Sequence, residues 1–328
     1  ISIPVFLDVA LVILAPLLYA LARDTKKSVL VFGLPLVAGM AVTHAFVPPT
    51  PGPVAVAYFL NVNLGYVIGF GVLVGLPTAI ICGPFLCSRM AKLVEVTTPT
   101  DQGEDLTSEE KKLPSFLQIA SLIALPIALI LAGTVVEQSA ISGIDPGLTK
   151  AERNAQVADI LNSMPTTNQV IHFLGHPVIA LMISTLLAIF FLGISRGTSK
   201  EDLVEISTKA LGPAGIIILI TGAGGVFKGV LIATGIADAL KEVFIGSPIP
   251  IIVLAYIFAT LVRIAQGSAT VAMLTAAGLM ASFVEGFTQP YLALIACAIA
   301  AGATGFSHVN DSGFWMISRY LGMTEKQT

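Results

Sequence analysis

Residues 305–315 place several chemically active side chains directly after a long apolar run. The segment reads GFSHVNDSGFW, so His308, Asn310, Asp311 and Ser312 stand close together in the sequence. Polar and titratable side chains at membrane depth are costly, and they are usually retained because they contact a ligand, an ion or a proton. The segment therefore predicts a binding site inside a membrane protein.

Two cationic side chains in apolar surroundings are candidates for binding an anion. Arg263 lies in the middle of the apolar span 249–284, too far from either end to reach the interface easily. Its planar guanidinium can hold a carboxylate with two hydrogen bonds, so we predict a contact with a substrate carboxylate. The alternative is a structural ion pair. Lys228 is predicted to be a second cationic contact or the partner of Asp238 or Asp311.

Four titratable residues are candidates for carrying a coupled proton. His44 and His308 can change charge near neutral pH, and the alternative for each is a structural hydrogen-bond donor. Asp311 can carry a proton or orient substrate hydroxyls, and the alternative is a cap on the following helix. Asp8 lies in an apolar run, where the alternative is an ion pair with another helix.

Hydroxyl and amide side chains near these groups can bind a polyhydroxylated ligand. They are Ser268, Thr270, Asn310 and Ser312. Each is ordinary when taken singly, because Ser and Thr also hold membrane helices together.

The composition explains why these groups are expected inside a bilayer. Of the 328 residues, 55% are hydrophobic and 11% are charged, and the mean hydropathy is +0.90, which leaves too little polar surface for a soluble protein. The net charge of −3 offers no basic face, so nucleic acid is not an expected partner. Cys82, Cys87 and Cys297 lack metal-ligand spacing, and we expect small buried side chains with neither a metal nor a disulfide.

The apolar runs are long enough for helices that cross a bilayer of about 30 Å. We predict an all-α multi-pass protein, because the runs are too long and uniform for barrel strands. The predicted spans are 1–22, 29–47, 64–87, 115–136, 176–195, 211–240 with an interruption, 249–284 as one or two passes, and 290–306.

Positive charges in short loops predict the orientation. The charges that face the cytoplasm in this interpretation are Arg23, Lys26, Lys27, Arg89, Lys92, Lys111, Lys112, Arg196, Lys200 and Lys209. Segment 88–114 is then a cytoplasmic linker, whose residues 101–112 are polar, and segment 137–171 is an external loop.

Four segments are predicted to break the helices beside polar residues. They are the proline-rich 48–53, the glycine-rich 222–225, Gln266–Ser268 and Gly302–Gly313. Unwound backbone at membrane depth survives where protein or a water-filled cavity satisfies it, and half-helix ends offer their dipoles to ions and carboxylates. Broken helices of this kind are typical of secondary transporters.

A weak internal repeat supports the same interpretation. Asp8 precedes His44, and Ser268 precedes His308, by similar separations with an apolar helix between them. The predicted orientation gives the two units opposite sense, as in inverted repeats. We therefore predict that residues 1–87 belong to a first repeat and residues 115–328 to a second.

Four segments, in order, resemble the signatures of the gluconate permease family of proton symporters. They are VTHAFVPPTPGP at 42–53, GAGGVFK at 222–228, RIAQGSATVA at 263–272 and HVNDSGFW at 308–315. The resemblance covers residues 6–323. It implies the ion transporter superfamily, inverted repeats with re-entrant hairpins, and a homodimer. The chain opens inside an apolar run without a signal peptide, and we expect a fragment that lacks earlier helices and one later helix.

Other functional classes fit the sequence less well. The pair Gly222 and Gly224 lacks the third glycine of a dinucleotide fingerprint, and Lys228 lacks the context of a phosphate loop. No nucleophile elbow or zinc-protease motif is present, so an enzyme is not expected. A passive anion channel is the alternative from another class, because broken helices also line pores.

The sequence thus predicts a secondary transporter of the inner membrane that takes up a sugar-acid anion, with gluconate as the expected substrate. The alternatives are another small hydroxy or amino acid, such as glycerate or D-serine. An inside-negative potential opposes entry of a lone carboxylate by about 2.3 kcal/mol per 100 mV, so at least one proton is expected to accompany it. No cofactor is expected, because the proton gradient supplies the energy. Sodium is the alternative coupling ion.

Overall fold

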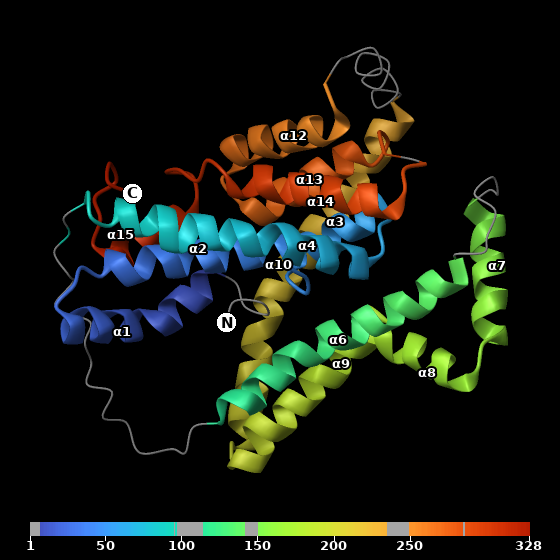
Figure 1. Ribbon diagram of the computed structural model, residues 1–328, viewed down its shortest axis with the longest axis horizontal. Helices are drawn as coiled ribbons and strands as arrows, with labels where there is room; N and C mark the ends of the chain where they lie inside the picture. Colours follow the sequence, from blue (N-terminus) through green and yellow to red (C-terminus); the bar gives the residue numbers. More distant parts are fainter. Residues whose placement is uncertain (1–6, 95, 97–113, 142–149, 235–248, 285) are drawn as a thin grey trace. The chain divides into compact units, whose positions relative to one another are not determined.

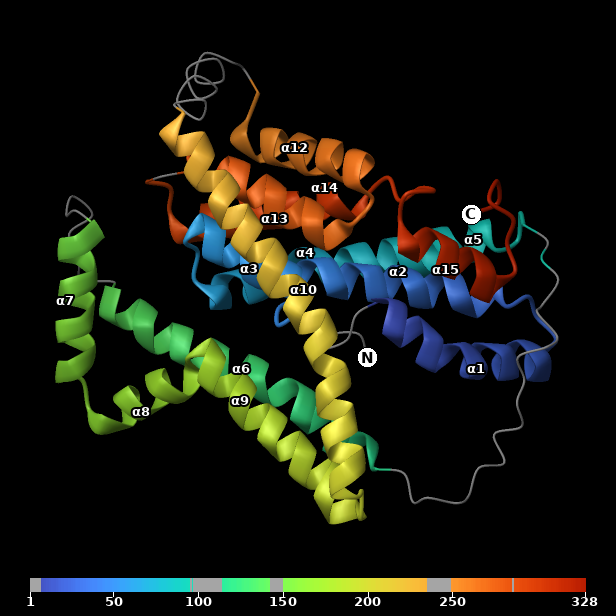
Figure 2. The same cartoon turned by 180° about the vertical axis from the view of Figure 1, so that it is seen from behind.

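The computed structural model describes residues 7–94, 96, 114–141, 150–234, 249–284 and 286–328. Every regular element in these residues is helical, which confirms the predicted all-α fold (Figures 1 and 2). Among the residues that the structure describes, four helical stretches are long and apolar enough to cross a membrane, and the chain is a multi-pass membrane protein. These stretches are Leu30–Leu60, Leu64–Met90, Phe116–Ala140 and Pro177–Arg196.

The chain forms two compact units. The first comprises residues 1–62, 66–110 and 216–328, and the second comprises 63–65 and 111–215. The first unit contains α1 (Leu7–Thr25), α2 (Leu30–Phe46), α3 (Pro51–Leu60), most of α4 (Leu64–Ile80), the π-helix η1 (Ile81–Cys87), α5 (Ser88–Met90), α12 (Ile251–Gln266), α13 (Ala269–Met280), α14 (Gln289–Thr304) and α15 (Ser312–Leu321). The predicted repeat boundaries at 87 and 115 stay a prediction.

The second unit is built around α6 (Phe116–Ile141), which packs against α8 (Thr166–Gly175) and α9 (Pro177–Ala188). It also contains α7 (Lys150–Ser163), the π-helix η2 (Ile189–Gly193) and the 3₁₀ turn η3 (Ile194–Arg196). Segment 137–171, predicted as an external loop, holds the end of α6, all of α7 and part of α8, so it is largely helical where it is described. Its side of the membrane stays a prediction.

One predicted helix break is wrong. The helix α10 (Lys200–Ala233) runs without interruption through Gly222–Gly225. Ser199 caps the start of α10 by accepting the N–H of Asp202 at 3.0 Å. Glu201 and Asp202 in the first turn stabilise the helix, because their negative charges lie near the positive end of its dipole. A glycine inside a helix costs about 1 kcal/mol, whereas an unwound backbone without partners in a bilayer costs several. The apolar run therefore stays helical.

The other three predicted breaks are present in the first unit. Helix α2 ends at Phe46, and α3 begins at Pro51, where a proline fits because its missing N–H would be unpaired anyway. Helix α12 ends at Gln266 and α13 begins at Ala269. Helix α14 ends at Thr304, and α15 begins at Ser312.

The span 249–284 is therefore two short helices that form a hairpin. At a rise of 1.5 Å per residue, α12 and α13 measure about 24 Å and 18 Å, less than the hydrocarbon thickness of about 30 Å. Gly267 makes the turn at φ +78°, a conformation that suits glycine. Both helices pack against α14, and α13 also packs against α3 (Figures 1 and 2).

Small residues allow these helices to approach closely. The buried face of α14 carries Ala293, Ala296, Ala300, Gly302 and Ala303. A side chain at Gly302 would overlap the backbone carbonyl of Tyr256 on α12. Small residues at such interfaces are the usual means by which membrane helices pack. Close packing of α12 on α14 fixes the end of α12 beside the segment that follows α14.

The last helix is held by a separate apolar cluster. Leu321 of α15 is fully buried against Leu30 of α2 and Leu11 of α1, and it fills the space above Gly33. The Tyr19 hydroxyl donates to the carbonyl of Tyr320 at 2.8 Å. These contacts anchor α15, and with it the segment 305–311, on the first two helices.

The turn at Gly267 yields a test of backbone strain. Gly267→Ala should destabilise the protein through both its positive φ and an overlap with the carbonyl oxygen of Asn310. Gly197 has the same φ, but a Cβ added there would have no neighbouring atom within 4 Å. Gly197→Ala should therefore cost only the backbone strain of the positive φ, about 1–2 kcal/mol. Thermal unfolding in detergent measures both variants. Equal losses of stability would contradict the close approach of Asn310.

The predicted orientation yields a labelling test. A cysteine at the exposed Ser163 should react with an impermeant maleimide in intact cells, because 137–171 is predicted to be external. A cysteine at the exposed Lys92 should react only after the membrane is opened. The parent chain measures the background from the three native cysteines. The reverse pattern would overturn the orientation.

Candidate functional site

Arg263 is a buried cation in the last turn of α12. It exposes 4% of its surface. Its Nη1 donates to the backbone carbonyl of Gly267, and its Nη2 forms an ion pair with Oδ2 of Asp311. Its Nε is buried and has no hydrogen-bond partner among the residues that the structure describes. The structural ion pair that the sequence left as an alternative is therefore present, and the Nε–H of the guanidinium is unused in the described residues.

Asp311 begins α15 and also neutralises Arg263. Its Oδ1 accepts the N–H of Gly313 at 3.0 Å, which caps the helix as the sequence alternative predicted. Its Oδ2 accepts from the Ser307 hydroxyl at 2.6 Å and from Arg263. One carboxylate therefore connects the segment after α14, the start of α15 and the end of α12.

His308 and Asn310 bind the end of α12 through a single acceptor. Nε2 of His308 lies 3.1 Å from the carbonyl oxygen of Ile264, and Nδ2 of Asn310 donates to the same oxygen at 2.9 Å. The last carbonyls of a helix lack partners within the helix, so these side chains supply them. The Trp315 indole donates to the Val309 carbonyl at 2.8 Å and closes the segment on itself.

Two helix starts lie at this site. Ser268 caps α13 by accepting the N–H of Val271 at 3.4 Å, and Thr270 lies half-buried in the first turn. Ser312 is exposed in the first turn of α15. Helix starts carry unpaired N–H groups and a partial positive charge, so both can attract an anion. The structure thus brings together seven predicted site residues: Arg263, Ser268, Thr270, His308, Asn310, Asp311 and Ser312.

His44 lies at the other break, near the end of α2. It is buried, and its backbone carbonyl accepts the Thr50 hydroxyl at 2.9 Å. The same hydroxyl lies 2.8 Å from the Val47 carbonyl. Thr50 thus supplies a hydrogen-bond donor to carbonyls at the end of α2, which the neighbouring prolines cannot do because they lack an N–H. The prediction that His44 and His308 each lie beside a break is confirmed, and their roles in proton coupling stay predictions.

Two predicted site residues have side chains outside the described part of the structure. Asp8 lies in α1 and Lys228 lies in the continuous α10. In the described residues Asp311 pairs with Arg263. The predicted pairing of Lys228 with Asp238 or Asp311 stays a prediction. Asp238 also lies outside the described residues.

Sequence reasoning missed a second polar cluster, in the second unit. Asn63 donates to the Glu137 carboxylate, and its Oδ1 accepts the Thr134 hydroxyl at 3.0 Å and the Gly65 N–H at 2.8 Å. Glu137 belongs to α6, whereas the sequence predicts it at the start of the external loop 137–171. Its position inside a run of helix-forming residues was the available signal. The contacts account for all three polar side chains as structural partners.

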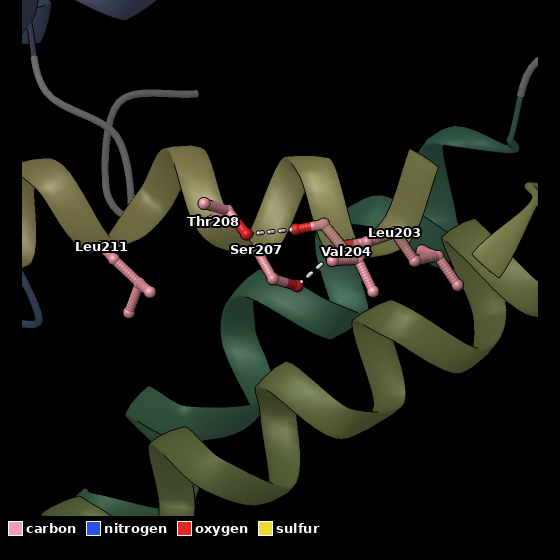
Figure 3. A pocket seen from close by; sticks show the side chains of 5 residues that line it. All are labelled: Leu203, Val204, Ser207, Thr208 and Leu211. Atoms are coloured by element: carbon pink, nitrogen blue, oxygen red, sulfur yellow. Dashed lines mark hydrogen bonds between the residues drawn. The ribbon is translucent and has the colours of Figure 1, made fainter. Parts of the chain in front are cut away.

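The hollows detected in the described residues are poor substrate sites. One of about 260 Å³ lies on α10, lined by Leu203, Val204, Ser207, Thr208 and Leu211 (Figure 3). Its two hydroxyls donate to carbonyls of their own helix at 2.8 Å, and none of its lining side chains is titratable. Another, beside Phe46 and Met273, is apolar and measures about 10 Å³, enough for one water at most. No cluster of metal ligands is found in the described residues.

The comparisons with known proteins agree with the resemblance of the four segments. A sequence family described as GntP family permease matches residues 1–328. The low-affinity gluconate transporter of Escherichia coli K12 is 36% identical over 100% of this chain and 69% of its own length. The inner membrane permease YgbN of Escherichia coli K12 is 36% identical over 98% and 69%. The gluconate permease of Bacillus subtilis 168 is 34% identical over 100% and 70%.

No solved structure matches the chain. The family match covers every residue, and relatives above 30% identity align with the whole chain over about 70% of their length. The chain belongs to the GntP family of permeases.

Proposed function

We propose that this permease takes up a sugar-acid anion, gluconate, together with protons across the inner membrane, as a multi-pass secondary transporter. The names of its relatives support gluconate as the substrate and the inner membrane as the location. Within the chain, the observation that carries the proposal is the buried Arg263 at the junction of two helix ends. Because the family and the relatives are permeases, we propose a transporter without an enzymatic step and without a cofactor.

The chemistry of the site fits an acid that carries several hydroxyls. A carboxylate requires a cation when it leaves water, and Arg263 is a buried cation with an unused Nε–H. The starts of α13 and α15 add partial positive charge. Ser268, Thr270, Asn310 and Ser312 can pair with hydroxyls, and Lys228 is proposed as a second cationic contact.

Proton coupling is proposed because the membrane potential opposes the entry of an anion. The membrane potential opposes entry of one negative charge by about 2.3 kcal/mol per 100 mV, and one accompanying proton cancels that opposition. Asp311, His308, His44 and Asp8 are the proposed proton carriers. Asp311 is the one whose carboxylate contacts Arg263. We also propose a homodimer, as the resemblance to the family implies.

The proposed function is tested by uptake into proteoliposomes. Gluconate should accumulate when the outside is acidic, and an ionophore that collapses the proton gradient should abolish accumulation without stopping exchange of labelled for unlabelled gluconate. Sodium should be dispensable.

Glycerate and D-serine, offered in the same exchange assay, serve as competing substrates. Undiminished accumulation with the ionophore at matched pH would reject proton symport. Flux that does not saturate and shows no exchange would identify a passive anion channel.

The role of Arg263 is tested by two substitutions. Arg263→Lys keeps the charge but loses the planar fork, so the half-saturation concentration for gluconate should rise about tenfold or more, since a charged hydrogen bond contributes roughly 1.5–3 kcal/mol. Arg263→Gln should abolish binding. Arg319, exposed in the last turn of α15, provides the matched control, and Arg319→Lys and Arg319→Gln should leave transport unchanged.

Folding is checked first, because an unpaired Asp311 can also unfold the protein. Near-normal binding by folded Arg263→Gln would make the arginine structural and would leave Lys228 as the cation to test.

A further inference from the structure

Asp311 uses the guanidinium of Arg263 incompletely. The edge of an arginine fork formed by Nε and Nη2 can hold both oxygens of one carboxylate. Asp311 takes Nη2 through Oδ2 alone, because Oδ1 is held by the N–H of Gly313, and Nε is left without a partner in the described residues. A second carboxylate that binds this edge with two hydrogen bonds would compete with Asp311 for Nη2.

We propose that Asp311 and the substrate carboxylate occupy this edge of Arg263 in turn, and that Asp311 takes up one proton when the substrate displaces it. This inference rests on the proposed function and deepens it. Two carboxylates beside one guanidinium leave an uncompensated negative charge in surroundings of low dielectric. The proton on Asp311 removes that charge, so the site holds one cation and one anion both before and after binding.

Asp311 can release Arg263 without losing its other contacts. The cap on Gly313 uses Oδ1, which a protonated carboxyl still offers as an acceptor. The Ser307 hydroxyl lies 2.6 Å from Oδ2, and by rotating it can accept the new proton in a hydrogen bond. The Asp311 side chain exposes 14% of its surface and Ser307 is exposed, so a proton has a route to Asp311.

Few other charges face Asp311 in the described residues. From α12 it meets Arg263, whereas His308 of its own segment directs Nε2 to the Ile264 carbonyl. The first turns of α13 and α15 carry no titratable side chain. Lys228 of α10 has a side chain outside the description. The charge balance at this site is therefore set chiefly by Arg263, Asp311 and the bound anion.

The proposal is tested by measuring the affinity for gluconate as a function of pH. In the parent protein, the dissociation constant should rise about tenfold per pH unit above the pH at which Asp311 ionises, because one proton is taken up with each substrate. Asp311→Asn should bind gluconate with an affinity that does not change with pH. It should also exchange gluconate without accumulating it.

Asparagine is a suitable replacement because it caps a helix about as well as aspartate, so α15 should keep its start. Asp311→Glu retains a titratable group and should keep the pH dependence. Asp24→Asn removes an exposed carboxylate that pairs with its neighbour Arg23, and it should behave as the parent.

Each result decides between the proposals. A folded Asp311→Asn that keeps the tenfold slope, or that loses binding altogether, overturns the exchange while leaving gluconate uptake intact. Parent protein that binds gluconate equally well at every pH also overturns it. Parent protein that binds none of gluconate, glycerate and D-serine overturns the proposed function itself.

Discussion

The charge on Arg263 has to be compensated inside the protein, because leaving a buried guanidinium unpaired costs about 3–5 kcal/mol, a large part of the stability of a folded chain. Asp311 provides the opposite charge, and the carbonyl of Gly267 provides an acceptor at the end of the same helix. Both partners depend on an interruption of the helices. Gly267 can offer its carbonyl because α12 stops there, and Asp311 is available because α15 starts there.

The two interruptions complete each other. The end of α12 leaves carbonyls unpaired, and His308 and Asn310 from the other interruption donate to one of them. The start of α15 leaves N–H groups unpaired, and Asp311 accepts one of them while it binds Arg263. Unwound backbone at these two breaks is thus satisfied by polar side chains of the breaks themselves, which is how broken helices persist at membrane depth.

The sequence predicted most of what depends on local chemistry. Prolines at 48–53, the Gly267–Ser268 turn and the polar segment after Thr304 each end a helix, and each end was found. The seven residues gathered at the site, His308 among them, were also predicted. Pairings between distant residues were not, because no local pattern says that Arg263 reaches Asp311 instead of a ligand, or that Asn63 reaches Glu137.

The failure at Gly222–Gly225 has a different cause. Glycine weakens a helix by about 1 kcal/mol, but in an apolar run the alternative of unpaired backbone costs more, so the propensity of the residue does not decide the outcome. At Gly267 a glycine does end a helix, and there the following Ser268 accepts an N–H of the next helix and the guanidinium of Arg263 holds the freed carbonyl. A break therefore needs partners for the groups that it exposes, and these come from the tertiary structure.

The energetics of a buried ion pair fit a site that must change partners. Such a pair contributes little net stability, whereas removing one partner costs about 3–5 kcal/mol. Exchange of Asp311 for another carboxylate at Arg263 is therefore nearly neutral, but a guanidinium without a partner is disfavoured by a factor of about one hundred to several thousand. A carrier with this site would reorient with Asp311 ionised and no substrate, or with substrate and a protonated Asp311. Movement of the substrate without its proton would require an uncompensated charge, and the burial of Arg263 is what makes that step costly.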